Sequence, residues 1–258
     1  MADEIVLEHQ GEISTLTLNR PQSFNAINSA MASAFLTTIN AVSARPETRV
    51  LIVQGAGKAF MAGGDVAQFE QAPETVLPEI LEPMHNAMKA LTELPIPVLA
   101  SVRGAVAGAG LSLMLACDLV IASETCKVSF AYTKLGASCD LGCSWALPRV
   151  VGMRKALEIV LLAEPISADE AKTLGLINQL VADTELAERT QLLAQRLADS
   201  APIALAELKQ LLRQSHQRSF SAQLEAERQS FTKCLASQDF KEAVAGFLQK
   251  RPVHFKGI

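Results

Sequence analysis

Two short runs at the start of the chain, IVLEHQ and ISTLTL, alternate apolar and polar residues and predict a β-hairpin around HQGE. Apolar residues at helical spacing in NSAMASAFLTTINAVSA predict a helix that begins behind Asn28 or Ser29 as its N-cap. The continuous apolar runs RVLIVQGAG and PVLASV predict buried strands. The segment GLSLMLACD predicts a buried helix, and LVIAS a strand after it. Strands and helices therefore alternate, which is typical of an α/β core.

The pattern changes in the second half of the chain, where the β signal disappears from about residue 183 onward. Four amphipathic helices are predicted there, in TELAERTQLLAQRLADS, PIALAELKQLLRQSH, SAQLEAERQSFTKCLAS and DFKEAVAGFLQKR. Earlier, PETVLPEILEPMHNAMKALTELP predicts a helix that Pro78 and Pro83 interrupt. We therefore expect an α/β core over residues 1–200 and a C-terminal helical region over residues 201–258.

Composition excludes several function classes. The 258 residues are 49% hydrophobic and 19% charged, which is typical of a globular protein with a large core. The net charge of −4 and the scattered Lys and Arg argue against a nucleic-acid-binding face. Ser112 and Asp118 interrupt the longest apolar stretch, LSLMLACDLVIA, so we expect no membrane span. The N-terminal MADEIVLEHQ lacks a secretory signal pattern, and five cysteines without metal-ligand spacing predict a reduced, cytoplasmic protein with no metal site.

Two glycine clusters stand just before helical patterns. The first is GKAFMAGGDV, residues 57 to 66, and the second is VRGAVAGAGLSLMLACD, residues 102 to 118. Glycines of this kind often serve turns alone, but they also let a ligand approach main-chain amides at the start of a helix. The spacing of a dinucleotide-binding loop is absent. One amide from each cluster could instead form an oxyanion hole for a carbonyl that becomes an enolate.

Asp140 is the only charged residue between Leu135 and Pro148. A carboxylate in such surroundings is commonly a surface turn residue or a helix N-cap. It can also be a desolvated acid–base group, because an apolar environment raises the pKa of a carboxyl and makes it a better proton acceptor. Placed beside an oxyanion hole, it could remove or deliver a proton next to the carbonyl.

The ordered motifs LNRPQSFNAIN, AFMAGGD, VRGAVAGAGLSLMLACD, FAYTKLG, LPRVVGMRKALEIVLLAEPISADEAKTLGLINQLV and KRPVHFKG together resemble the crotonase, or enoyl-CoA hydratase/isomerase, superfamily. The similarity runs along nearly the whole chain. It implies a crotonase-type ββα spiral core that binds acyl-CoA over residues 1–200 and an oligomerisation region over residues 201–258. It also implies a homotrimer or a dimer of trimers, an acyl-CoA substrate, and no metal or redox cofactor.

The resemblance assigns roles to single positions. It implies that the main-chain amides of Gly64 and Ala109 form the oxyanion hole, although a glycine is usual at the second position. Ala62 and its neighbours would meet the adenine end of CoA, and Lys256 would approach the CoA phosphates or adenine. For Asp65 we favour a carboxylate that opens a helix and stabilises its N-terminus, with substrate binding as the alternative.

The chain departs from the hydratases of this family at their two water-activating glutamates. Ser112 and Tyr132 occupy those positions. Neither side chain is an ionised base near neutral pH, since a free Tyr has a pKa of about 10. Asp140 stands where the isomerase branches carry an acid, and its surroundings are most similar to those of ring-1,2-epoxyphenylacetyl-CoA isomerase and Δ3,Δ2-enoyl-CoA isomerases. We therefore predict an acyl-CoA isomerase that moves a double bond, or rearranges a ring-epoxide acyl-CoA, through an enolate with Asp140 as its acid and base, and we predict weak hydratase activity.

Three alternatives stay open. The chain could be a hydratase-type member of the family. It could be an aryl-CoA dehalogenase, in which Asp140 is the nucleophile, a His stands at a position similar to His85, and a Trp stands where this chain has Tyr132. It could also be an acyl-CoA binder without activity. His85, Ser112 and Tyr132 are candidate substrate contacts in each case, and we expect residues 68–83 to cover the acyl group.

Overall fold

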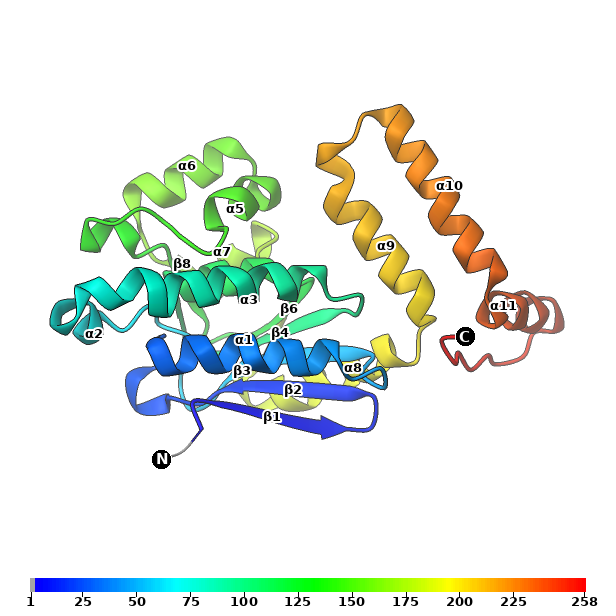
Figure 1. Ribbon diagram of the computed structural model, residues 1–258, viewed down its shortest axis with the longest axis horizontal. Helices are drawn as coiled ribbons and strands as arrows, with labels where there is room; N and C mark the ends of the chain where they lie inside the picture. The colour runs from blue at the N-terminus through cyan, green and yellow to red at the C-terminus, as the bar shows by residue number, and fades with distance from the viewer. Residues whose placement is uncertain (1–2) are drawn as a thin grey trace.

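Six strands in the order β1-β2-β3-β4-β6-β9 form the main sheet of the computed structural model, which describes residues 3–258 (Figure 1). The strands are β1 (Ile5–Gln10), β2 (Ile13–Leu18), β3 (Val50–Gly55), β4 (Val98–Val102), β6 (Leu119–Ser123) and β9 (Gln179–Val181). β1 and β2 form the expected antiparallel hairpin, and each later strand pairs in parallel with its neighbour. The continuous apolar runs of β3 and β4 lie in the middle of this sheet, where both faces of a strand are buried.

A second, three-stranded sheet lies beside the first and has the order β5-β7-β8. Its strands are β5 (Ala105–Ala107), β7 (Lys127–Ser129) and β8 (Ile166–Ser167). β5 follows β4 and β7 follows β6, so the chain leaves one sheet and enters the other twice. This repeated step places the second glycine cluster at the junction of the two sheets.

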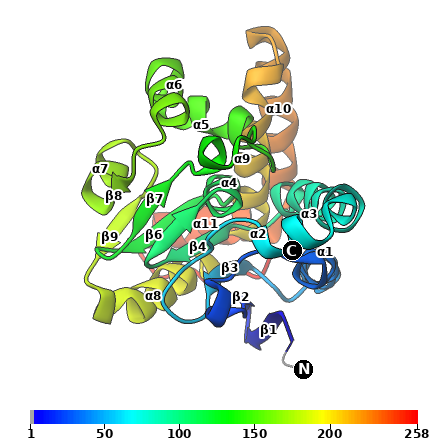
Figure 2. The same cartoon turned by 90° about the vertical axis from the view of Figure 1, so that its left-hand side faces the viewer.

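Helices cover both faces of the main sheet, as the view roughly along its strands in Figure 2 shows. α1 (Ser29–Ser43) and α3 (Glu82–Glu93) pack on one face, in a core that includes Phe35, Leu51 and Leu91. α8 (Leu186–Ala198) packs on the other face against residues such as Ile52. The sequence predicted α1 correctly, and its N-cap is Asn28, whose side chain accepts a hydrogen bond from the Met31 amide at 2.8 Å.

The segment before α3 does not break at its two prolines as predicted, because it stays helical through both and changes only its helix type: Pro78 lies inside a π-helical turn that leads directly into α3. The segment begins with α2 (Val66–Gln71), continues through η2 (Pro73–Thr75) and the π-helical turn η3 (Val76–Leu81), and becomes regular only in α3. Pro83 lies in the first turn of α3, directly after the π-helical turn, and as a proline it donates no main-chain hydrogen bond there. The remaining helices of the core are η1 (Pro21–Ser23), α4 (Ala109–Ala116), η4 (Tyr132–Leu135), α5 (Cys143–Val151), α6 (Met153–Leu162), α7 (Ala168–Thr173) and η5 (Asp183–Glu185).

The C-terminal helices project from one end of the molecule (Figure 1). They are α9 (Pro202–Gln214), η6 (Ser215–Gln217), α10 (Phe220–Ala236) and α11 (Gln238–Gln249). α9 is tied to the core by ion pairs from Lys209 and Arg213 to Asp118, at 2.7 and 2.5 Å. The boundary expected at residue 200 falls between α8 and α9, and its role in oligomerisation stays a prediction. No helix within residues 3–258 combines the length and apolar character of a membrane span.

Candidate active site

The two glycine clusters lie side by side and run in the same direction. Met61 of the first forms a parallel bridge with Val106 of the second, and the Ala107 amide donates to the Met61 carbonyl at 2.9 Å. Gly64 lies three residues beyond Met61, and Ala109 lies three residues beyond Val106. Because the two segments run in parallel from this bridge, the two predicted oxyanion-hole residues come next to each other.

Close packing between these loops explains two of the glycines. A Cβ atom at Gly110 would lie 2.3 Å from the Met61 carbonyl oxygen, which leaves no room for a side chain. Gly63 has a φ of +106° and a Cβ there would lie 3.9 Å from the Ala109 amide nitrogen. The first loop therefore touches the start of α4 through main-chain atoms.

The amides of Gly64 and Ala109 are both available to a ligand. Ile27 donates to the Gly63 carbonyl and accepts from the Asp65 amide, each at 2.8 Å, and so bypasses the Gly64 amide between them. Ala109 is the first residue of α4, so its N–H has no intrahelical acceptor. Within residues 3–258 neither amide donates to a main-chain carbonyl in a turn or loop. Two such donors, one of them at the N-terminus of α4, can stabilise a negative oxygen.

Two other residues assigned to the first loop make contacts within the protein. The Ala62 amide donates to the Phe24 carbonyl at 3.0 Å. Asp65 opens α2 as expected, but its side chain makes no capping hydrogen bond. Its carboxylate instead pairs with the Arg20 guanidinium at 2.9 Å. The interpretation of Asp65 as a helix-opening residue is therefore correct in position, while its main partner is an arginine.

Asp140 joins Ser112 and Tyr132 in one hydrogen-bonded group. The Tyr132 hydroxyl donates to Oδ1 of Asp140, and it lies 3.1 Å from Oγ of Ser112. Ser112 Oγ also donates to the main-chain carbonyl of Asp140 at 3.1 Å. Asp140 is not the N-cap of α5, because Gly142 holds that position. The structure therefore brings the lone carboxylate together with the two residues at the hydratase acid positions.

Burial dominates the electrostatics of this group. It raises the pKa of Asp140, against the lowering effects of the Tyr132 hydrogen bond and of nearby His85. Burial also raises the pKa of Tyr132 far above its ordinary value, and the Asp140 charge adds to that shift. The phenol therefore stays protonated at neutral pH and remains a hydrogen-bond donor to the carboxylate. Asp140 is only half-buried, so one side of it faces open space.

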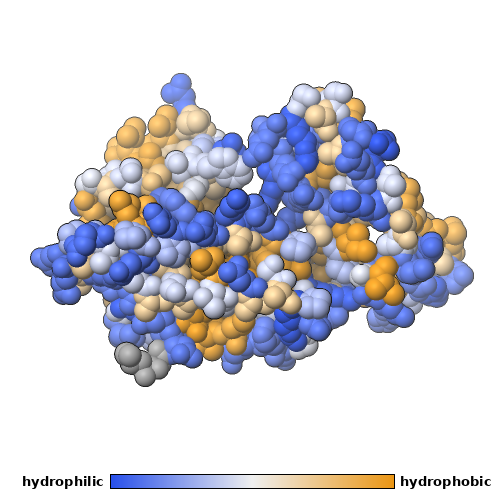
Figure 3. Space-filling model, in the orientation of Figure 1, coloured by the Kyte–Doolittle hydropathy of each residue, from blue (hydrophilic) through white to orange (hydrophobic). Residues whose placement is uncertain are grey.

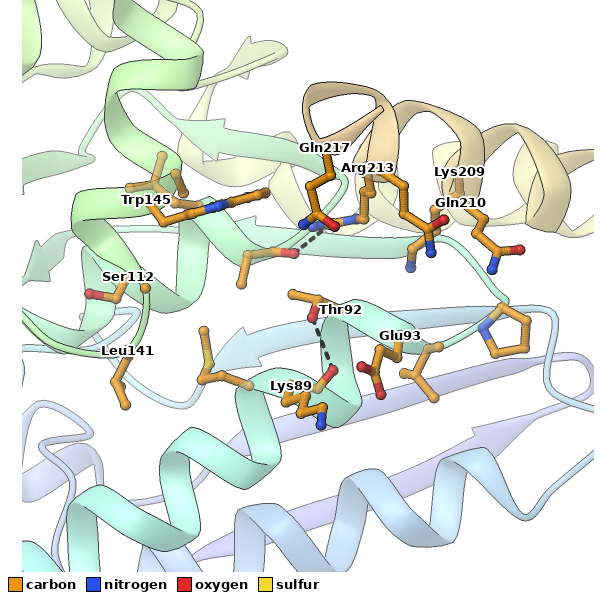
Figure 4. A pocket seen from close by; sticks show the side chains of 18 of the residues that line it. Lys89, Thr92, Glu93, Ser112, Leu141, Trp145, Lys209, Gln210, Arg213 and Gln217 are labelled. Carbon is orange, nitrogen blue, oxygen red and sulfur yellow. Dashed lines mark hydrogen bonds between the residues drawn. The ribbon is translucent and has the colours of Figure 1, made fainter. Parts of the chain in front are cut away.

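A cavity of about 880 Å³ lies next to this group, between α3, α5 and α9 (Figure 4). Ser112, Leu141 and the exposed His85 line the end near Asp140. Lys209, Arg213 and Gln217 of α9 and its following turn line the opposite wall. A space of this size can hold a small acyl group. Neither residues 68–83 nor Gly64 and Ala109 line this cavity, so the expectation that residues 68–83 cover the acyl group stays a prediction.

Lys256 is the one predicted site residue that the structure leaves apart from the others. Its amide donates to the buried Asp239 carboxylate at 2.7 Å, next to the start of α11. The C-terminus and α2 lie at opposite ends of the molecule in Figure 1. Within a single chain Lys256 therefore does not reach the glycine loops.

Some features of the site had no signal in the sequence. The aromatic ring of Phe69 packs against Gly64, because a Cβ there would lie 2.3 Å from Cζ of Phe69. Trp145 and Arg213 line the cavity although they are 68 residues apart in sequence. The hydrogen bond from Tyr132 to Asp140 was also missed, since a spacing of eight residues through an irregular loop fixes no contact.

Comparisons with known proteins point to one family. The enoyl-CoA hydratase/isomerase family profile matches residues 8–258. The chain is 39% identical to a probable enoyl-CoA hydratase of Rhodobacter capsulatus, over 95% of each protein. It is 36% identical to the 1,2-epoxyphenylacetyl-CoA isomerase of Escherichia coli, over 98% of this chain and 99% of that protein.

A solved structure gives the same result for the fold. The crystal structure of a putative enoyl-CoA hydratase from Streptomyces coelicolor matches with a TM-score of 0.94 and 31% identity, over 99% of this chain and 94% of that one. The predicted crotonase-type core with a helical C-terminal region is therefore confirmed.

Proposed function

The chain belongs to the enoyl-CoA hydratase/isomerase family, and from that premise we propose that it is an acyl-CoA isomerase that moves a carbon–carbon double bond. One observation carries the proposal. A single half-buried carboxylate, Asp140, is hydrogen-bonded to Tyr132, whose ring rests against the loop that carries the Ala109 amide, and the family resemblance puts Ser112 and Tyr132 at the positions of the two hydratase acids.

The proposed reaction begins with the thioester of a 3-enoyl-CoA. Its carbonyl oxygen accepts hydrogen bonds from the amides of Gly64 and Ala109. Asp140 removes a proton from C2, and the electron pair of that C–H bond forms a dienolate whose charge rests on the thioester oxygen. Two preorganised donors stabilise that charge, and one such donor is worth about 10²–10³-fold in rate.

The second half-reaction returns the proton. Asp140, now a neutral carboxylic acid, protonates C4, and the double bond comes to rest between C2 and C3. Nothing is oxidised or reduced and no atom is added, so one carboxylate and two amides complete the cycle without a metal or redox cofactor. The raised pKa of Asp140 suits the first step, because it makes the carboxylate a stronger base.

Water addition fits this arrangement poorly. A hydratase must hold a water and deprotonate it in one geometry. Ser112 and Tyr132 hydrogen-bond to Asp140 and lie 3.1 Å from each other, so neither acts as an ionised base for that water. We therefore propose that hydration of crotonyl-CoA is weak in this protein.

A panel of acyl-CoA thioesters tests the proposal. It contains a 3-enoyl-CoA, a 2-enoyl-CoA, a ring-epoxide arylacetyl-CoA and a 4-halobenzoyl-CoA, with products separated by chromatography. We expect double-bond migration, and turnover of the ring epoxide would identify the activity that the E. coli relative is named for. Rapid formation of 3-hydroxyacyl-CoA would make the chain a hydratase, halide release a dehalogenase, and tight binding without turnover an acyl-CoA binder.

We also propose that the protein assembles as a homotrimer or a dimer of trimers. Large apolar side chains remain exposed on the C-terminal helices, among them Leu208, Leu212, Phe220, Phe231 and Phe247. Figure 3 shows apolar surface there and over α6. Association would cover these side chains, and a neighbour could bring its own Lys256 to the CoA site. Sedimentation as a monomer at micromolar concentration would contradict this proposal.

A further inference from the structure

We infer that Tyr132 is a positioning residue that anchors Oδ1 of Asp140 and thereby makes Oδ2 the oxygen that takes and returns the proton. The inference rests on the proposed function, which it deepens by dividing the work between the two carboxyl oxygens. It also gives a role to the phenol of Tyr132, which stands where the hydratases of the family carry an acid.

The position of the Tyr132 hydroxyl is fixed by packing on its ring. The ring centroid lies 5.1 Å from that of Phe130, with the planes tilted by 56°. A Cβ atom at Gly108 would lie 3.9 Å from Cζ of Tyr132, so the ring also rests against the loop that carries the Ala109 amide. Tyr132 is buried between these neighbours. It therefore links the oxyanion-hole loop to the Asp140 loop.

Hydrogen-bond accounting supports a fixed role for Oδ1. The phenol has one proton, which it donates to Oδ1 of Asp140. Oδ1 accepts this bond when Asp140 is a carboxylate, and it still accepts it as the carbonyl oxygen of the acid when Oδ2 carries the proton. Ser112 fixes the main-chain carbonyl of the same residue at 3.1 Å, so the loop is held from two sides. The carboxyl group can thus change its charge without turning.

Among the titratable groups around Asp140, Tyr132 is the one that hydrogen-bonds to its carboxylate. His85 comes from α3, Cys143 from α5, and Cys139 from the Asp140 loop itself. Burial raises the pKa of the Cys143 thiol to about 12, so it stays neutral. His85 acts on Asp140 as a nearby charge, whereas Tyr132 is bonded to it directly.

The variant Tyr132→Phe keeps the ring and removes only the hydroxyl. We expect kcat for double-bond migration to fall about tenfold, the size of one hydrogen bond to a charged group, with KM unchanged. The bond from Tyr132 lowers the pKa of Asp140, so the acid limb of the pH–rate profile moves to higher pH in this variant. A lower kcat with an unmoved acid limb would reduce Tyr132 to a packing residue and overturn the inference.

A second measurement needs no substrate, so it separates this inference from the proposed reaction. Tyr132 is the only tyrosine of the chain, so the ultraviolet absorbance of its phenol can be followed alone. The phenol donates a hydrogen bond to Oδ1 of Asp140, and protonation of the carboxylate weakens that bond. We therefore expect the phenol absorbance to shift as the pH falls and Asp140 takes up its proton, and we expect no such shift in Asp140→Asn. A wild-type absorbance with no more pH dependence than that of Asp140→Asn would overturn the inference. If the shift appears but no acyl-CoA is isomerised, only the proposed function fails.

The chain offers a matched control. Ser101 on β4 and Thr190 on α8 share a buried hydroxyl–hydroxyl hydrogen bond of 2.8 Å, on the face of the sheet that α8 covers. Ser101→Ala removes a hydroxyl of similar burial outside the site. We expect it to leave kcat, the acid limb and the pH-dependent phenol absorbance as in the wild type. Equal changes in Ser101→Ala and Tyr132→Phe would mean that any buried hydroxyl has this effect, and would overturn the inference.

Discussion

The two halves of the candidate site are built from different parts of the polypeptide. Main-chain amides of Gly64 and Ala109 form one half, and their positions depend on how two loops pair. Three side chains form the other half, centred on Asp140. A site made of amides tolerates a change of side chain, such as Ala109 at a position where glycine is usual. A site made of side chains does not, because each atom has its own chemical task.

The largest expected effect comes from breaking the side-chain half. Asp140→Asn keeps the size of the side chain but removes the basic oxygen. General acid–base catalysis is worth about 10²–10⁴-fold, so kcat for double-bond migration should fall by that factor. The affinity for acyl-CoA should stay as in the wild type, because the proposed thioester contacts are main-chain amides. Asp183→Asn, which alters an exposed carboxylate near Arg103, is the control.

A steric change tests the amide half. A Cβ at Gly64 would collide with the ring of Phe69, so Gly64→Ala should displace the loop and lower kcat by up to about 10²-fold, the value of one oxyanion-hole donor. The double variant Gly64→Ala with Phe69→Leu relieves the collision and should recover most of the rate. If the double variant stays as slow as the single one, the Gly64 amide is not the feature that matters.

The acid limb of the wild-type pH profile is expected to report on Asp140. The base form is needed to remove the C2 proton, so kcat/KM should rise with pH through the pKa of Asp140. Burial raises that pKa, so the acid limb should lie above the pH expected for an ordinary Asp. The same shift makes the folded protein lose stability as the pH rises through the interval between the ordinary and the raised pKa. Thermal unfolding of Asp140→Asn should lack that loss, and an acid limb at the ordinary value would argue against a desolvated base.

The smallest effect is expected at the second amide. Ala109→Gly keeps the N–H and removes only a methyl group. We expect kcat and KM to change by less than about threefold, since the donor contributes the stabilisation. A loss as large as that of Asp140→Asn would show that the Ala109 side chain itself has a role.

The periodicity of apolar residues predicted most of the larger strands and helices. The hairpin, α1, the buried strands and the four C-terminal helices follow from periods of two and 3.6 residues, which local geometry imposes. The strands β5, β7, β8 and β9 were not predicted, because two or three residues are too short to show a period. The helices α5, α6 and α7 were also not assigned from periodicity, although their sequence formed part of the family resemblance.

For the site, the sequence suggested candidate residues but not their contacts. Glycine clustering pointed to two loops and the isolated charge to Asp140, the family resemblance assigned Gly64 and Ala109 within those loops, and the roles of all three stay predictions. The partners of these residues depend on where the loops end in space, as the bonds from Tyr132 to Asp140 and from Asp65 to Arg20 show. The position of Lys256 depends on assembly, which a single chain does not contain.

The central claim is that Asp140 carries one proton from C2 to C4 of the acyl chain. Single-turnover reaction of a 3-enoyl-CoA in D₂O, followed by NMR of the product, tests it most directly. The account predicts a 2-enoyl-CoA in which part of the hydrogen at C4 comes from C2 and escapes exchange with solvent, and it predicts that this transfer is lost in Asp140→Asn. The account would be contradicted if Asp140→Asn formed, at the wild-type rate, a 2-enoyl-CoA with the same share of C4 hydrogen derived from C2. It would also be contradicted if the main product of the wild type were a 3-hydroxyacyl-CoA.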